Sequence, residues 1–229
     1  MENPEIQNLI KILGIQIGTK YENVSKLRYG NIMIMTDQDH DGSHIKGLLI
    51  NFVHHFWPSL LKMNGFLREF VTPIIKATKG NEQNTFFTIP EYENWAKDRD
   101  LKGYKIKYYK GLGTSTAKEA KEYFAKIDAH SIDFEYEDDT DFDAIDLAFN
   151  KKLADRRKEW LKTYSAETFV DHSQRTLRYK DFVNKELILF SVADCARSIP
   201  NLCDGFKPGQ RKILFSAFKK RLTKEIKVA

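Results

Sequence analysis

The feature that most restricts the fold of this chain is a short apolar run that ends on a cluster of acids. Residues 31–36 read Asn-Ile-Met-Ile-Met-Thr, and Asp37, Asp39 and Asp41 follow at alternate positions before Gly42. A continuous apolar run of this length is typical of a strand buried on both faces in a parallel sheet. Because ligands of such sheets gather at the carboxyl ends of the strands, the three aspartates are candidates for a functional site.

A helical pattern follows the acids. Apolar residues recur at helical spacing from Ile45 to Trp57, which predicts an amphipathic helix that Pro58 ends or kinks. The predicted buried stripe consists of Ile45, Leu48, Leu49, Phe52, Val53, Phe56 and Trp57. We expect further helices over residues 5–17 (stopping near Gly14), 115–128, 143–162, 181–193 and 209–221, and strands within 67–76 and 104–109. This alternation predicts an α/β fold, with a polar connector over 165–180 and a boundary near residue 165.

The aspartates at 37, 39 and 41 favour a divalent cation, because clustered carboxylates ionise cheaply only beside a positive charge and oxygen ligands suit Mg²⁺. Three other interpretations stay open. An EF-hand calcium loop matches the first six positions, but Leu48 stands where it requires a glutamate, and a strand precedes the loop instead of a helix. A phosphotransferase would use Asp37 as its nucleophile, which leaves Asp41 unexplained. A solvated acidic turn needs no ligand.

Charge is unevenly distributed along the chain. The net charge is +5, but residues 205–229 hold eight basic residues and one acid, so this segment carries +7 and the remainder −2. A basic end on a nearly neutral body indicates either a polyanion partner or a solvated helix face. Residues 133–146 hold eight acids at irregular spacing, which predicts an exposed acidic loop in preference to a metal site.

Neither a membrane span nor a secretory signal is expected. No apolar run approaches the roughly 20 residues that a membrane helix needs, and the N-terminus lacks the basic and apolar segments of a signal peptide. Cys195 and Cys203 are too few for a disulfide scaffold or a zinc site. This cysteine usage favours a reducing compartment, the cytosol or the nucleus.

A glycine loop, Lys110-Gly-Leu-Gly-Thr114, lies between a predicted strand and a predicted helix. Thr116 and Glu119 have the spacing of a capping box at the start of that helix. Glycines permit close backbone approach and a helix N-terminus favours anions, so the loop suits either a phosphate contact with Lys110 or a plain tight turn. It is not a Walker A loop, whose pattern is absent.

Four segments carry a resemblance to a known family. They are residues 32–47, 107–115, 184–190 and 197–212, and the last includes Arg-Ser-Ile-Pro at 197–200 and Asp-Gly-Phe-Lys-Pro-Gly-Gln-Arg-Lys at 204–212. In this order they resemble the eukaryotic type IIA DNA topoisomerases over nearly the whole chain. The resemblance implies a TOPRIM domain over residues 1–165, a Rossmann-like parallel sheet with flanking helices whose N-terminal part is missing. Residues 166–229 would then be a connector and the incomplete, mainly helical start of a winged-helix DNA-binding domain.

The same resemblance assigns roles to individual residues. Asp37, Asp39 and Asp41 would hold Mg²⁺, for which Mn²⁺ or Ca²⁺ can substitute, with Asp37 acting in catalysis and Asp41 binding directly or through water. Lys110 would act at the DNA cleavage site. The implied contacts to the DNA backbone are Lys110, Arg197, Lys207, Arg211 and Lys212.

The implied enzyme is a nuclear, homodimeric, ATP-hydrolysing topoisomerase that cleaves double-stranded DNA transiently and passes a second duplex through the break. The ATPase domain, the TOPRIM glutamate and the nucleophilic tyrosine of the family are missing from this sequence, so we expect a fragment that binds no ATP and is inactive alone. Arg178-Tyr179 and Arg28-Tyr29 mimic the family's arginine–tyrosine pair, but both stand in the wrong order. Two alternatives are another TOPRIM phosphotransferase, such as a primase or nuclease, and a non-catalytic nucleic-acid-binding module.

Overall fold

The computed structural model describes residues 3–87, 89–109, 113, 115–165, 168–171 and 174–227. The main sheet has the strand order β1-β2-β6-β7, formed by β1 (Ile32–Ile34), β2 (Leu67–Phe70), β6 (Ser131–Glu135) and β7 (Thr176–Arg178). The β1–β2 and β6–β7 pairs are parallel and the β2–β6 pair is antiparallel. The α/β class is therefore confirmed, with a mixed sheet in place of the parallel one that the sequence predicts.

The strand before the acids is shorter and more exposed than predicted. β1 lies at the edge of the described sheet, and its Ile34 is buried while Ile32 and Met33 are only half-buried. Met35, which directly follows the strand, is exposed. The prediction of a strand buried on both faces is wrong, because β1 pairs on one side only within the described residues.

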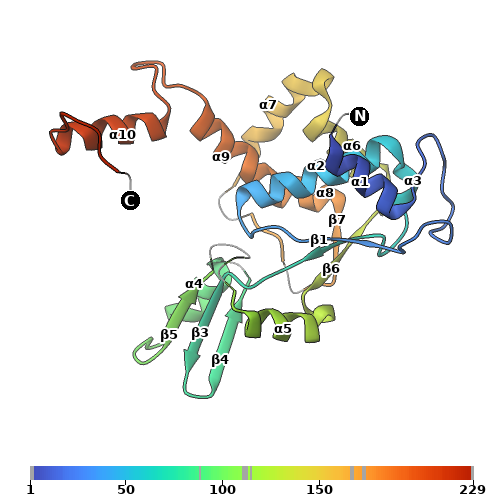
Figure 1. Ribbon diagram of the computed structural model, residues 1–229, viewed down its shortest axis with the longest axis horizontal. Helices are drawn as coiled ribbons and strands as arrows, with labels where there is room; N and C mark the ends of the chain where they lie inside the picture. Colours follow the sequence, from blue (N-terminus) through green and yellow to red (C-terminus); the bar gives the residue numbers. More distant parts are fainter. Residues whose placement is uncertain are drawn as a thin grey trace.

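A second, smaller sheet lies apart from the first (Figure 1). It has the order β4-β3-β5, with β3 (Ile75–Lys79), β4 (Glu82–Phe86) and β5 (Lys105–Tyr108) all antiparallel. A small core of Ile75, Ala77 and Phe86 packs against aromatic residues that include Trp95 of α4 (Ile89–Lys97). As the sequence predicts, two strands lie on either side of Pro73, and they belong to different sheets.

Local signals place most helix ends correctly. α1 (Pro4–Leu13) ends at Gly14, whose φ of 71° is left-handed, and α2 (His40–Phe56) stops before Pro58, which begins α3 (Pro58–Leu61). The capping box of Thr116 and Glu119 is present at α5 (Ala117–Ala125), which the short helix η2 (Ile127–Ala129) follows.

The C-terminal half is mainly helical. The helix expected over 143–162 is divided into α6 (Asp139–Phe149), η3 (Lys151–Leu153) and α7 (Ala154–Lys162). The helix expected over 181–193 is assembled from α8 (Tyr179–Asp181), a π-helical turn η4 (Phe182–Leu187) and α9 (Ile188–Ser198), and α10 (Pro208–Lys219) follows as predicted. The predicted connector contributes β7 to the main sheet, and the boundary near 165 stays a prediction.

The buried face of α2 is not the predicted one. Ile45 and Leu48 are 50% and 46% exposed, whereas Gly47 is buried on the opposite side of the helix. A Cβ at position 47 would lie 2.9 Å from the ring of Phe149 and 3.2 Å from Leu187. The predicted stripe is wrong for its first two members, because the helix packs against α6 and η4 through its smallest residue.

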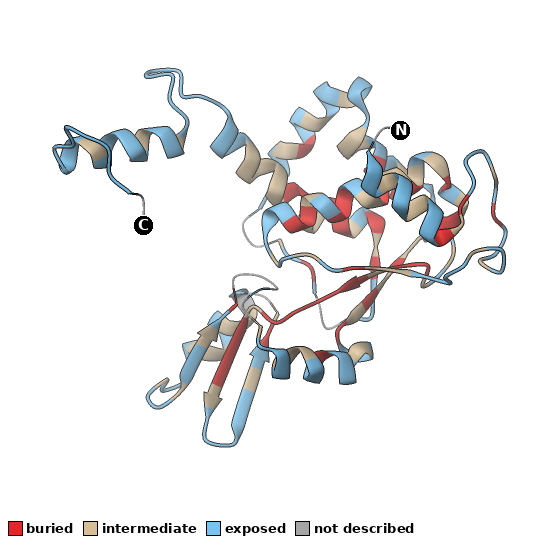
Figure 2. Cartoon of the chain, viewed as in Figure 1, coloured by how far each residue is buried: buried red, intermediate tan, exposed pale blue. Residues whose placement is uncertain are grey.

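A buried ion-pair network also marks this face. The Nζ atom of Lys46 lies 2.6 Å from Oε2 of Glu69 on β2 and 2.5 Å from Oε1 of Glu186 on η4. Burial alone would lower the pKa of Lys46, but the carboxylates of Glu186 and Glu69 raise it above its ordinary value. The network therefore ties α2 to the sheet and to the π-helical turn (Figure 2).

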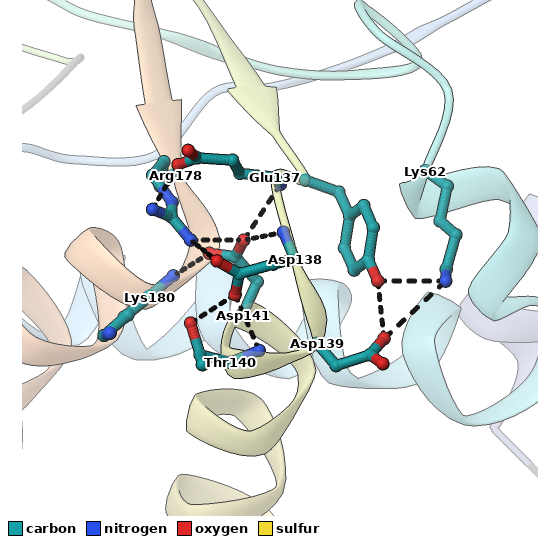
Figure 3. Close-up of polar contacts among 9 residues, drawn as sticks. Lys62, Glu137, Asp138, Asp139, Thr140, Asp141, Arg178 and Lys180 are labelled. Carbon is teal, nitrogen blue, oxygen red and sulfur yellow. Dashed lines mark hydrogen bonds and ion pairs between the residues drawn. The ribbon is translucent and has the colours of Figure 1, made fainter.

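The acidic stretch 133–146 is ordered, which corrects the predicted exposed loop. It forms β6 and the start of α6, and its Asp141 is 0% exposed. The Asp141 carboxylate accepts hydrogen bonds from the backbone N–H groups of Glu137 and Lys180, both at 2.9 Å, and from Arg178 at 3.0 Å (Figure 3). This acid therefore joins the β6–α6 turn to β7 and α8.

Candidate functional site

The three predicted metal acids lie between the end of β1 and the first turn of α2. Asp39 caps α2, and its Oδ1 atom accepts a hydrogen bond from the N–H of Gly42 at 2.7 Å. A Cβ at Gly42 would lie 2.0 Å from the carbonyl oxygen of Asp37, so the helix packs directly on the loop that carries Asp37. The glycine of the motif therefore fixes the first acid relative to the helix that begins at the second.

The third acid, Asp41, is paired with an arginine. The guanidinium of Arg197, at the end of α9, donates from Nη2 to Oδ1 at 2.6 Å and from Nη1 to Oδ2 at 3.0 Å. Its Nε atom donates to Asp194, also at 3.0 Å. The hydrogen bonds from Arg197 lower the pKa values of both carboxyl groups. A predicted DNA contact and a predicted metal ligand thus occupy one another across 156 residues of sequence.

The donor chemistry fits a hard cation at two of the three acids. Among the residues that the structure describes, no three His, Cys, Asp or Glu side chains are gathered to hold a metal ion. Mg²⁺ is usually bound through one or two carboxylates with waters and substrate phosphates. Asp37 and Asp39, exposed at the end of β1, meet that requirement, whereas both oxygens of Asp41 are engaged by Arg197.

The other predicted DNA contacts lie on and before α10, which extends away from both sheets (Figure 1). Lys207 and Lys212 are exposed. Arg211 forms a second bidentate pair, with both of its bonds to Asp204 at 2.7 Å, and this lowers the pKa of Asp204 to about 2. Apolar side chains of α10 are also exposed, among them Phe218 at 74% (Figure 2). The basic segment is therefore accessible along its length.

Lys110 lies outside the described residues, as do Gly111, Leu112 and Thr114. The flanks of the glycine loop are joined to one another. Glu119 of α5 accepts a hydrogen bond from the hydroxyl of Tyr109, and its carboxylate lies 2.9 Å from Nζ of Lys107. Burial opposes ionisation of Glu119, but its hydrogen bonds lower its pKa to about 2.

Sequence reasoning missed three side chains that support this region. Asp194 holds the arginine that contacts Asp41, and the hydroxyl of Ser43 donates to Glu186 at 2.7 Å. The only signal for Glu186 was its place in the segment 184–190, and a π-helical turn has no simple sequence pattern.

Residues 70–195 match the family described as the C-terminal associated domain of TOPRIM, and residues 197–229 match a family of DNA gyrase/topoisomerase IV. The chain is 59% identical to DNA topoisomerase 2 of Arabidopsis thaliana over 99% of its length. This chain belongs to the type II DNA topoisomerase family. It is also 57% identical to the family member DNA topoisomerase 2-beta of Homo sapiens, over its whole length.

The family assignment agrees with the fold. The described structure is similar to the crystal structure of the Plasmodium falciparum topoisomerase II DNA-binding, cleavage and re-ligation domain, with a TM-score of 0.88 and 57% identity. That match covers 100% of this chain and 32% of the other. The chain spans only 16% of the Arabidopsis relative and 15% of the human one. The resemblance to eukaryotic type IIA enzymes is thus confirmed, and none of the described helices has the length and apolar character to span a membrane.

Proposed function

We propose that this chain supplies the metal-binding acids and part of the DNA-backbone contacts of a type II topoisomerase. The observation that carries the proposal is the contact between Asp41 and Arg197, which sets an acid of the predicted cation site against a predicted phosphate ligand. Acids and basic groups that share one edge suit a phosphodiester with its counter-cation.

In this proposal, Asp37 and Asp39 hold Mg²⁺ or a substitute such as Mn²⁺ or Ca²⁺, and Asp41 joins them directly or through water. A cation there would neutralise charge on the oxygens of the scissile phosphate. Lys110 would lie beside that phosphate.

The basic residues would bind the DNA backbone. Arg197, Lys207, Arg211 and Lys212 would contact phosphates, which position the duplex without reading its sequence.

The complete protein would be a nuclear homodimer that uses ATP to pass one duplex through another. The nucleophilic tyrosine, the TOPRIM glutamate and the ATP site would come from parts outside these 229 residues, so the chain alone should not cleave DNA. The burial of Tyr179 supports its rejection as the nucleophile. It is 1% exposed, and burial raises the pKa of its hydroxyl well above the ordinary value.

Calorimetric titration with Mg²⁺ tests the metal site. Asp39→Asn should weaken binding, and its fold should survive because asparagine caps helices as well as aspartate does. Asp143→Asn removes the same charge from an exposed position on α6 and should leave the affinity unchanged. Equal affinities for the wild-type and Asp39→Asn chains would move the metal elsewhere. Binding of DNA with no metal bound at all would favour the non-catalytic module.

A further inference from the structure

We infer that Arg197 and Asp41 form a latch that couples DNA binding to metal binding. The latch is closed when the guanidinium of Arg197 covers both oxygens of Asp41. A DNA phosphate that takes over the guanidinium opens it, and Asp41 then becomes available to the cation. This inference rests on the proposed function, because it assigns a regulatory step to the same acids and the same arginine.

The two partners cannot serve their proposed ligands and one another at once. A guanidinium presents two edges for paired hydrogen bonds, and Arg197 uses one for Asp41 and the Nε side for Asp194. A phosphate must therefore displace one carboxylate. A cation that approaches Asp41 must likewise displace the guanidinium.

The geometry determines which carboxylate leaves. Asp194 lies three residues before Arg197 on the same helix, and its carboxylate also accepts a hydrogen bond from Ser198 at 3.0 Å. Asp41 belongs to another helix. Displacing Asp41 leaves the local pair intact, so Asp194 keeps the guanidinium extended toward the phosphate.

The helices that carry the latch are packed together, so opening needs only side-chain movement. The rings of His44 and Phe190 stack at 4.0 Å between centroids, in the same interface as Asp41 and Arg197. The Arg197 guanidinium itself lies 5.6 Å from the Phe190 ring centroid. Deeper in the same interface, the Lys46–Glu186 ion pair joins α2 to η4.

The exposure of the pair sets the size of the effect. Both side chains are about half exposed, and exposed ion pairs change affinities and stabilities by about twofold to fivefold. The latch is thus weak enough for DNA to open. Because coupling between two ligands is reciprocal, DNA should tighten metal binding by the same factor by which metal tightens DNA binding.

The test measures Mg²⁺ affinity of the full 229-residue chain by calorimetry, without DNA. Arg197→Lys keeps the positive charge but removes the bidentate fork, so it should tighten Mg²⁺ binding by about twofold to fivefold. Arg211→Lys is the matched control, because it breaks a bidentate pair of the same kind with Asp204. That control should leave the metal affinity unchanged.

A double variant isolates the partner. In a chain that carries Asp41→Asn, the further change Arg197→Lys should give no gain. Wild-type affinity in Arg197→Lys, or an equal gain with Asp41→Asn present, would overturn the latch while metal binding at Asp39 stands. If Asp39→Asn leaves the affinity unchanged, the metal site fails and the latch fails with it. Should the wild-type chain bind too weakly to measure, Arg197→Lys must make binding measurable, and silence in both overturns the latch.

Discussion

Asp141→Asn should destabilise the chain, because the buried carboxylate joins two segments with four hydrogen bonds. Its Oδ2 atom accepts from the N–H groups of Glu137 and Asp138 and from Arg178, and its Oδ1 atom accepts from the N–H of Lys180. An asparagine has one oxygen, so its NH₂ group must face at least one of these donors. The best orientation keeps the oxygen toward Arg178 and leaves the Lys180 N–H without its acceptor.

The loss follows from hydrogen-bond energetics. A hydrogen bond to a charged group contributes about 1.5–3 kcal/mol, and a buried donor without an acceptor costs about 1–3 kcal/mol. We expect the free energy of unfolding to fall by about 3 kcal/mol in total. At about 2–4 °C per kcal/mol for a chain of this size, the Tm should drop by about 6–12 °C.

Thermal unfolding followed by circular dichroism provides the measurement, with Asp143→Asn as a control that removes an exposed charge from the same helix. Burial alone would raise the pKa of Asp141, but hydrogen bonds from the Glu137 N–H and from Arg178 hold it below the ordinary value. The stabilisation is therefore present above the unfolded pKa of about 3.9 and is lost as the pH falls through the lower folded pKa. The difference between wild type and Asp141→Asn should shrink below about pH 4. A Tm drop no larger than that of the control, or one that persists in acid, would refute this reasoning.

Three further predictions concern the core, the basic segment and the tyrosine. Lys46→Met leaves two buried carboxylates without their cation and should cost about 3–5 kcal/mol in chemical denaturation; an unchanged midpoint would contradict the role of this network. If four basic residues meet phosphates, log K for duplex DNA should fall with log salt at a slope of about −3.6, and the double change Lys207→Ala with Arg211→Ala should flatten that slope by about two units. An unmoved slope in a helical protein would mean that this charge is a solvated surface. Supercoiled plasmid incubated with Mg²⁺ and the chain should yield no protein-linked DNA, and an adduct that disappears in Tyr179→Phe would reverse our rejection of that residue.

Features that depend on neighbouring residues could be predicted from the sequence. The end of α1 at Gly14, the break at Pro58 and the cap of α5 at Thr116 each rest on a residue whose own backbone or side chain decides the local conformation. The position of Asp37 and Asp39 after β1 belongs to the same class, because a strand followed by a helix places the intervening acids at the sheet's edge.

Features that depend on distant partners could not be predicted. Periodicity favoured Ile45 as a buried residue, but the ring of Phe149 and the carboxylate of Glu186 determine which face of α2 is buried. An acid such as Asp141 looks solvated until Arg178 is brought against it by the pairing of β6 with β7. The pairing of Asp41 with a residue 156 positions away has no local signal.

The position of β7 has a consequence for the order of folding. Its Leu177 pairs beside Phe134 in the main sheet, and Tyr179 then stacks on that phenylalanine in the core. A ribosome must therefore release the whole polar stretch between α7 and β7 before the outer face of β6 can be covered. Contacts so distant in sequence form late and slowly. During synthesis, the edge of β6 is left open to wrong partners, and this interval is where a chaperone would act on the nascent chain.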